Sequence, residues 1–179
     1  MSLGTPAGRM RPDEAAALCR LLDEEEMQYR RLRRLAWRQT AYLKRRDAER
    51  LEKNAHEWRQ FVPLAEAARR RREAHVAALA RHLGEAEGTL AGPELAARAG
   101  PPHRERIAAA VCRLAATAGD LYRQNGLNAL LARFCLELVQ QEADIFRQVV
   151  TGDPSGGYAE SGRRAAGAGA TGSVIWRRA

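Results

Sequence analysis

The stretch from Arg104 to Val150 constrains the fold more than any other part of this 179-residue chain. Its apolar residues recur at alternating steps of three and four, which is the period of an amphipathic helix. No proline falls inside it, and at 1.5 Å per residue the helix would be roughly 70 Å long. A helix of this length cannot bury its apolar stripe alone, so other helices must cover it. The stripe consists of Ile107, Val111, Leu114, Ala118, Leu121, Cys135, Leu138, Ile145 and Val149.

Two asparagines, Asn125 and Asn128, stand in the middle of this stripe, where the pattern would place leucine or alanine. Polar residues in the seam of a helical bundle can fix the register or the oligomeric state at some cost in stability. Alternatively, the pair and the neighbouring Gly126 mark a place where the groove between helices is open to a partner. Both interpretations are compatible with the sequence.

Two earlier stretches carry the same helical period, at about residues 13–44 and 47–83. Asp13 and Asp47 stand at their starts and are residues typical of helix N-caps, so a bend or break is expected between the two helices. One continuous bent helix is the alternative. Glycines and prolines then interrupt the pattern over residues 84–103, which predicts the main loop of the domain. The sequence therefore predicts an all-α fold, an elongated antiparallel bundle of three long helices resembling a helical hairpin or coiled coil.

The ends of the chain lack this periodicity. Residues 1–12 are expected to form a flexible leader, and residues 13–150 the helical bundle, with its last helix at about 104–150. Residues 151–179 are rich in glycine, alanine and arginine, and they are expected to form a flexible tail. Both tails are expected to be disordered.

The overall composition limits the possible functions. The formal charge of +8 suggests nucleic acid, but residues 13–150 contain 24 basic and 20 acidic residues that are interspersed along the chain. No apolar run is long enough for a membrane span, and no signal peptide is evident, so a cytoplasmic location is expected. The three cysteines are widely spaced within helical patterns, which favours small core residues in a reducing compartment; they are Cys19, Cys112 and Cys135.

The sequence contains no arrangement of residues typical of catalysis. A glycine-rich phosphate loop and a nucleophile elbow are both missing. The four histidines are not spaced as zinc ligands on a helix, and no Glu-x-x-His pair is present for a di-metal site. Neither an enzymatic activity nor a cofactor or metal ion is expected. The expected function is therefore recognition of a partner, by a helical surface, by a flexible tail, or by both.

Each predicted helix and the tail carry residues that form a recognisable pattern when taken in order. The first helix carries Glu25, Leu32, Leu35 and Leu43. The second begins with Asp47 and Leu51 and ends with Arg72, Leu79, Leu83 and Gly84. The third carries Asn125, Asn128, Leu130 and Leu131, and Tyr158 stands in the tail. Together these residues resemble the flagellar export chaperones of the FlgN type, and the resemblance covers about residues 13 to 162.

The resemblance implies a cytosolic type III export chaperone that binds hook-associated proteins, the junction proteins between hook and filament, and keeps them export-competent. It implies that C-terminal helical segments of these clients bind the C-terminal part of the chaperone. Tyr158 would dock at the cytoplasmic domain of the flagellar export gate. The residues expected to contact the client are Asn125, Asn128, Leu131, Leu138, Ile145, Phe146 and Val149. For each of the apolar ones, packing on the first two helices is the alternative.

Two other functions remain open at this point. Arginine clusters such as residues 30–34 and 69–72 suggest a basic helical protein that binds nucleic acid, although nucleic acid is not the expected partner. The long apolar stripes also suggest a structural coiled-coil homo-oligomer.

Overall fold

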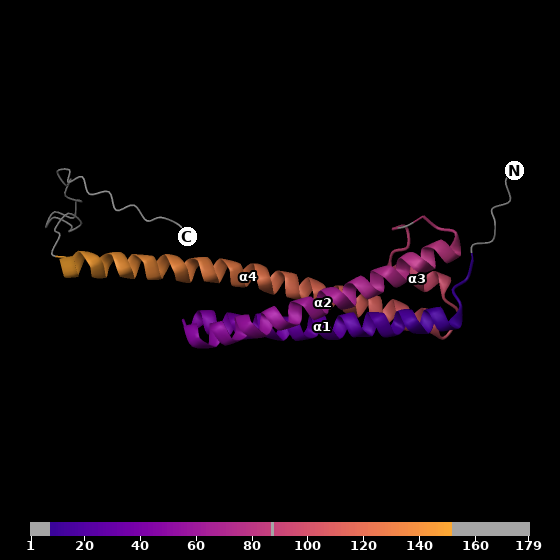
Figure 1. Cartoon of the computed structure of the whole chain (residues 1–179), viewed down its shortest axis with the longest axis horizontal. Helices are drawn as coiled ribbons and strands as arrows, with labels where there is room; N and C mark the ends of the chain where they lie inside the picture. The colour runs from indigo at the N-terminus through magenta and orange to yellow at the C-terminus, as the bar shows by residue number, and fades with distance from the viewer. Residues whose placement is uncertain (1–7, 87, 152–179) are drawn as a thin grey trace. The chain divides into compact units, whose positions relative to one another are not determined.

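The computed structural model describes residues 8–86 and 88–151, which form four α-helices and no strand (Figure 1). The chain divides into two compact units between Arg133 and Phe134. The all-α class predicted from the sequence is confirmed, but the described residues form four helices instead of the predicted three. Within the described ranges, no helix combines the length and the apolar character needed to cross a membrane.

The first helix, α1, runs from Pro12 to Lys44. The prediction that Asp13 caps it is wrong, because Arg11 occupies the N-cap position and proline, with its fixed φ, fits the first turn that follows. Glu14 accepts hydrogen bonds from the backbone N–H of Arg11 at 2.9 Å and from its guanidinium at 2.7 Å. These bonds hold the pKa of Glu14 below its ordinary value.

The residues just before α1 belong to the core of the first unit. Met10 is only 5% exposed, and its backbone N–H donates to the carbonyl of Arg98 at 3.0 Å. Arg98 in turn donates to the carbonyl of Gly8 at 3.3 Å. The predicted flexible leader, residues 1–12, is therefore wrong at its C-terminal end, because a buried apolar side chain anchors it. Residues 1–7 lie outside the described residues.

The second helix, α2, runs from Ala48 to Leu83 and lies antiparallel beside α1 (Figure 1). The predicted break after Lys44 is confirmed, as is the cap: the Asp47 side chain accepts from the backbone N–H of Arg50 at 3.0 Å. Gly84 ends α2 with a φ of +72°, a left-handed conformation that glycine adopts without steric cost.

Polar side chains fix the pairing of α1 with α2. Glu25 on α1 is 2% exposed and accepts a hydrogen bond from Arg72 on α2. An unpaired carboxylate at this depth would cost several kcal/mol, so the ion pair sets which turns of the two helices meet. Asn54 on α2 is also buried, and its amide donates to the backbone carbonyl of Leu35 at 3.2 Å.

The predicted loop over residues 84–103 contains a third helix, α3, from Gly92 to Arg98. It buries Leu95 and Ala96. Gly92 lies against the last helix, and a Cβ atom there would stand only 2.4 Å from Cγ1 of Val111. Any larger residue at Gly92 would force either α3 or the Val111 side chain to shift, because that distance is far inside van der Waals contact.

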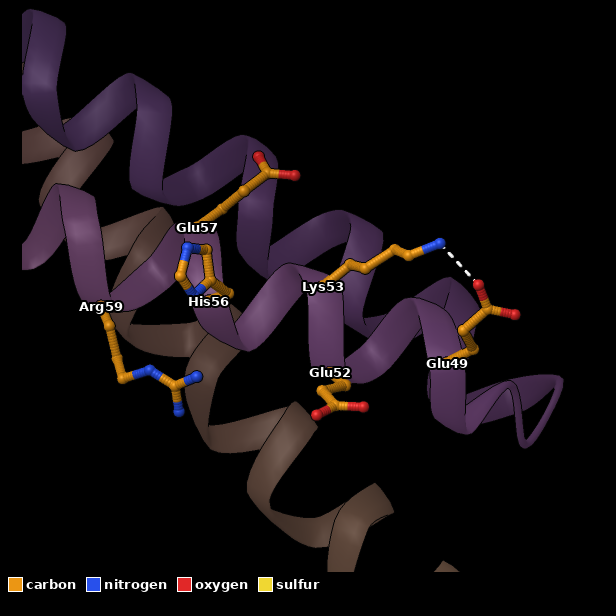
Figure 2. Close-up of a pocket in the computed structure, with 6 residues that line it drawn as sticks. All are labelled: Glu49, Glu52, Lys53, His56, Glu57 and Arg59. Atoms are coloured by element: carbon orange, nitrogen blue, oxygen red, sulfur yellow. Dashed lines mark hydrogen bonds and ion pairs between the residues drawn. The ribbon is translucent and has the colours of Figure 1, made fainter.

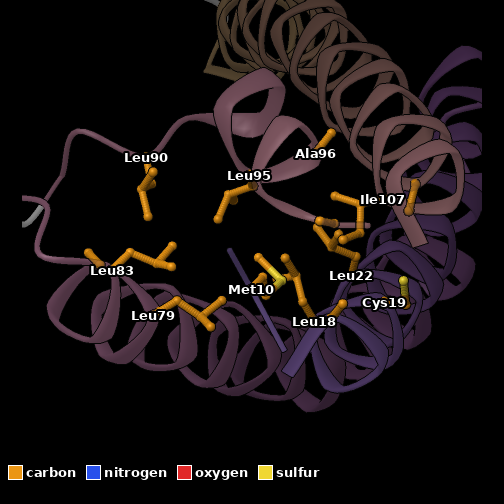
Figure 3. Packing of buried hydrophobic residues seen from close by; sticks show 14 residues of the cluster. Met10, Leu18, Cys19, Leu22, Leu79, Leu83, Leu90, Leu95, Ala96 and Ile107 are labelled. Carbon is orange, nitrogen blue, oxygen red and sulfur yellow. The ribbon is translucent and has the colours of Figure 1, made fainter. Parts of the chain in front are cut away.

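Side chains from all four helices and from the segment before α1 converge in the main apolar core of the first unit (Figure 3). A smaller cluster lies further along α1 and α2, around Leu32, Leu35 and Ala65. The main core consists of Met10, Ala15, Leu18, Cys19, Leu22, Leu79, Ala80, Leu83, Leu90, Leu95, Ala96, Ala99, Ile107 and Ala110.

The last helix, α4, runs from His103 to Thr151 and crosses the boundary between the units. Within the first unit it lies parallel to α1, because contacts with α1 advance along both helices. Arg113 donates to Asp23 at 2.9 Å, and further on Asp120 accepts from Arg33 at 3.1 Å.

The three cysteines differ in their surroundings. Cys19 is buried in the main core, as predicted, and burial raises the pKa of its thiol. Cys112 is exposed and Cys135 is half-buried. The prediction that all three are core residues is therefore wrong for Cys112, which lies on the outer side of α4 while its neighbour Val111 packs against the core.

Candidate partner-binding surface

The surface of α2 has a hollow near its N-terminal end, and Figure 2 shows the charged side chains that line it. Within the hollow, Lys53 donates to Glu49 at 2.5 Å (Figure 2). Across the described part of the chain, no group of three or more histidine, cysteine or acidic residues is arranged to hold a metal ion. The lining residues are Glu49, Glu52, Lys53, His56, Glu57 and Arg59.

Asn128, one of the two asparagines in the apolar stripe, is 3% exposed and lies between α4 and α1. Its amide nitrogen donates to the backbone carbonyl of Ala36 at 2.8 Å and to the side-chain oxygen of Gln39 at 3.0 Å. Its amide oxygen accepts from the hydroxyl of Thr40 at 2.6 Å. Both ends of the amide are thus satisfied within the chain, as a buried amide requires.

Gln124 extends this network by one helical turn. It is 5% exposed, and its amide donates to the Thr40 hydroxyl at 2.6 Å. Sequence reasoning missed both Gln124 and Thr40. The signal was present, since Gln124 precedes Asn128 by four residues and therefore shares its helix face. The contacts of Asn128 agree with the register interpretation of a polar residue in the seam.

Two other predicted client residues lie in the first unit, and both are half-buried. They are Asn125 and Leu131. Asn125 directly follows Gln124, so its side chain lies about 100° further round α4. Leu131 follows Asn128 by three residues and remains on the same side of the helix. Neither is as deeply enclosed as Asn128.

The second unit carries an apolar face on α4. Leu138, Ile145, Phe146 and Val149, all predicted from the sequence, share one side of the helix because their spacings match its period. Leu138 is half-buried, whereas Ile145, Phe146 and Val149 are 61%, 69% and 74% exposed. Apolar side chains that share one helix face at such exposure are typical of a surface that binds a partner.

Three further residues belong to this face. Cys135, Val139 and Val150 have the same helical phase as the predicted set, and Val139 and Val150 are 52% and 65% exposed. Sequence reasoning counted Cys135 in the stripe but missed the two valines, although each stands directly beside a stripe residue. The set Cys135, Leu138, Val139, Ile145, Phe146, Val149 and Val150 is called the α4 apolar face below.

Polar residues cover the opposite side of this part of α4. Most are exposed and uncharged or acidic, and Arg147 donates to Asp144 at 2.9 Å along the same helix. The helix is therefore amphipathic, with two exceptions: Glu142 has the helical phase of the apolar face, and Leu136 lies on the polar side. The polar side consists of Glu137, Gln140, Gln141, Asp144, Arg147 and Gln148. Tyr158, the residue predicted to dock at the export gate, lies outside the described residues.

Comparison with protein-family models matches residues 10–166 to the model described as FlgN protein. The match covers most of the chain, including every helix of the structure and the whole α4 apolar face. The chain belongs to the FlgN family. FlgN proteins are flagellar chaperones and not enzymes, and membership implies a role in flagellar export.

The family relationship confirms the resemblance drawn from the asparagine pair and the helix-end motifs. FlgN chaperones bind flagellar hook-associated proteins, which indicates the kind of partner a member of the family takes. Comparisons with curated proteins and with solved structures gave no match.

Proposed function

We propose that this FlgN family member acts in the cytoplasm as an export chaperone for the hook-associated junction proteins and keeps them export-competent. We place the client on the α4 apolar face. The observation that carries this placement is the exposure of Ile145, Phe146 and Val149, each more than 60% exposed in the free protein.

Physical chemistry supports this placement. A water-exposed row of large apolar side chains is unfavourable, and covering it stabilises a complex by roughly 25 cal/mol for each Å² removed from water. Apolar side chains spaced at three, four and seven residues along α4 suit a client helix that packs against α4. A client segment held in this way has its own apolar stripe covered and is protected from aggregation before export.

Asn128 does not belong to this client surface, since its amide is already engaged with α1. A client that displaced these bonds would have to replace each one, because leaving a buried amide unsatisfied costs about 1 to 3 kcal/mol. Asn125 and Leu131 are half-buried in the first unit and remain proposed client contacts. Tyr158 remains the proposed docking residue for the export gate.

The test mixes the full-length chain with purified hook-associated junction proteins of the same organism and measures complex formation by calorimetry and light scattering. A 1:1 complex at micromolar concentration is expected. Replacing Ile145, Phe146 and Val149 together by serine should weaken it at least about thirtyfold, as expected for apolar anchors at the centre of an interface.

Leu64→Ser is the matched control, because Leu64 is an exposed apolar residue on α2, at 47%. It should bind the client like the unchanged chain. Absence of any complex would reject the proposed function. Unchanged binding by the triple variant would reject the α4 apolar face as the site. A stable dimer of the chain alone, abolished by the triple variant, would show that the face serves self-association instead.

A further inference from the structure

A second exposed apolar spot lies in the first unit, where α1 and α4 meet. Trp37 on α1 is 60% exposed, and Leu127 and Leu130 on α4 are 55% and 62% exposed. Tryptophan is the side chain that gains most from burial, and in the surfaces of free proteins it often marks a binding site. None of these three residues belongs to the α4 apolar face.

Hydrogen bonds place Trp37 and Leu127 on the same seam. Trp37 lies between Arg33 and Thr40 on one side of α1, at spacings of four and three residues. Leu127 follows Asp120 and Gln124 on one side of α4, at spacings of seven and three.

These two sides face each other. Arg33 donates to Asp120 at 3.1 Å, and Gln124 donates to Thr40 at 2.6 Å. The side of α1 that holds Trp37 is therefore the side that meets α4, and Leu127 borders it from the other helix. Leu130 follows Leu127 by three residues and widens the apolar strip outward. The three apolar residues form what is called the Trp37 seam below.

The charge around the Trp37 seam is strongly positive. The side chains at helical spacing from Trp37 include four basic residues, and α4 adds Arg123 four residues before Leu127. Arg30 pairs with Glu26, and both Arg33 and Arg123 pair with Asp120. The four on α1 are Arg30, Arg33, Arg34 and Lys44.

Arg34 and Lys44 form no ion pair within the ranges that the structure describes. Both are exposed, and they stand three residues before and seven residues after Trp37. After Glu26, no acidic residue occurs on α1 until the helix has ended. The seam thus offers uncompensated positive charge beside apolar side chains, which suits an anionic amphipathic partner.

We propose that the Trp37 seam is a second docking site, and that its occupant is an acidic amphipathic helix of another protein. Two parallel helices that lie side by side can pack a third helix against both by ridge-into-groove packing. Leucine-like residues of the partner cover Trp37 and Leu127, and its glutamates or aspartates pair with Arg34 and Lys44. The α4 apolar face should favour a basic partner instead, because three of the four charged residues between Phe134 and Val150 are acidic.

The probe is a fluorescein-labelled amphipathic peptide of leucine, alanine and glutamate, about 18 residues or five turns long. Its binding to the full-length chain is followed by fluorescence anisotropy at low and at physiological salt. The comparison peptide carries lysine in place of every glutamate. The acidic peptide should bind, more weakly as salt increases, and at least about tenfold more tightly than the lysine peptide.

The double variant Trp37→Ser, Leu127→Ser should lose at least about tenfold in affinity for the acidic peptide. Arg34→Glu should lose affinity and flatten the salt dependence. Leu64→Ser and Arg59→Glu are the controls on α2, and they should bind like the unchanged chain. All the replaced side chains are exposed, so circular dichroism and melting temperature should not change.

The triple variant of Ile145, Phe146 and Val149 should still bind the acidic peptide, which separates this proposal from the client site. Equal binding by the unchanged chain and the Trp37, Leu127 double variant would overturn the proposal. So would lysine peptide binding as tight as that of the acidic peptide, or no detectable binding of the acidic peptide at low salt.

Discussion

Individual polar side chains determine how the helices of the first unit meet. Asn128 joins α4 to α1 through bonds to Ala36, Gln39 and Thr40, and Glu25 joins α1 to α2 through Arg72. Apolar side chains can pack in several registers, whereas a buried amide or carboxylate finds its partners in only one. These residues therefore contribute specificity as well as stability.

Replacing Asn128 by alanine should lower the free energy of unfolding by about 1 to 3 kcal/mol, because Thr40 and the Ala36 carbonyl lose a buried partner. Asn125→Ala is the matched control. Asn125 is half-buried in the same helix, and its replacement should change stability by about 0.5 kcal/mol or less. Urea unfolding followed by circular dichroism measures both. Equal losses would contradict the role assigned to the Asn128 network.

Protonation of the Glu14 carboxylate should lower the free energy of unfolding as the pH falls into the acid range. Hydrogen bonds from Arg11 hold its pKa below the ordinary value, and its carboxylate also lies 3.1 Å from Nδ1 of His82. A carboxylate whose pKa is lowered by folding stabilises the native state above its unfolded pKa and loses that contribution as pH falls through the folded pKa. Glutamine at position 14 can keep the bond to the backbone N–H but not the charge, so Glu14→Gln should cost about 0.3 to 1 kcal/mol near neutral pH.

The difference between Glu14→Gln and the unchanged chain should shrink as the pH is lowered below the usual range of a glutamate. Thermal melts between neutral and acid pH measure it, with Asp13→Asn as the control because the Asp13 side chain is 76% exposed. A difference that stays constant down to strongly acid pH would show that the Glu14 charge is not involved.

At the scale of the elements, α4 has two different parts. Its first part buries Ile107 completely, at 0% exposure, against the core that includes α1 and α3. Its last part, after Arg133, exposes most of the apolar face. The apolar side chains of α4 thus pack inside the protein in the first unit, whereas in the second unit they are available to a partner.

A matched pair of substitutions within α4 tests this difference. Ile107→Ala should lower the free energy of unfolding by about 2 to 5 kcal/mol, because it leaves a cavity in the core. Ile145→Ala should change it by about 0.5 kcal/mol or less, because that side chain is 61% exposed. Thermal or urea unfolding of both variants measures the two stability losses. An equally large loss for Ile145→Ala would mean that the face is already covered in the free protein.

The long helices follow from the sequence because a sustained period of three and four residues has no other common explanation. Asp47 was predictable as a cap, since its side chain acts on the N–H groups of the next turn. The short helix α3 was predictable only as one possible turn at residues 94–98, because a helix of seven residues depends on tertiary contacts such as that of Gly92 with Val111. Met10 was missed for a similar reason, as one buried residue before a helix leaves no periodic signal.

The candidate site could be predicted only in part. Periodicity identified Leu138, Ile145, Phe146 and Val149 as one face, but a stripe of this kind is the same whether it packs inside the protein or binds a partner. Only the exposure of each residue distinguishes the two. For Asn128 the sequence allowed either a residue that fixes the register or an open groove, and its contacts with α1 favour the first.

At the scale of the whole molecule, basic and acidic residues are unevenly distributed over the two proposed binding surfaces. Arginines and a lysine surround the Trp37 seam, whereas acidic residues predominate beside the α4 apolar face. Surfaces of opposite charge discriminate between partners, because like charges brought together raise the free energy of the wrong complex. The high isoelectric point of this FlgN family member is thus compatible with two separate protein partners.

Amide hydrogen exchange of the full-length chain, with and without a hook-associated junction protein, tests the central claim most directly. Amides of residues 134–150 should exchange more slowly in the complex, because a bound client stabilises this part of α4 against local opening. Amides in α1 and α2 should change little. Protection confined to the first unit, or no change at residues 134–150 in a complex known to have formed, would contradict the placement of the client on the α4 apolar face.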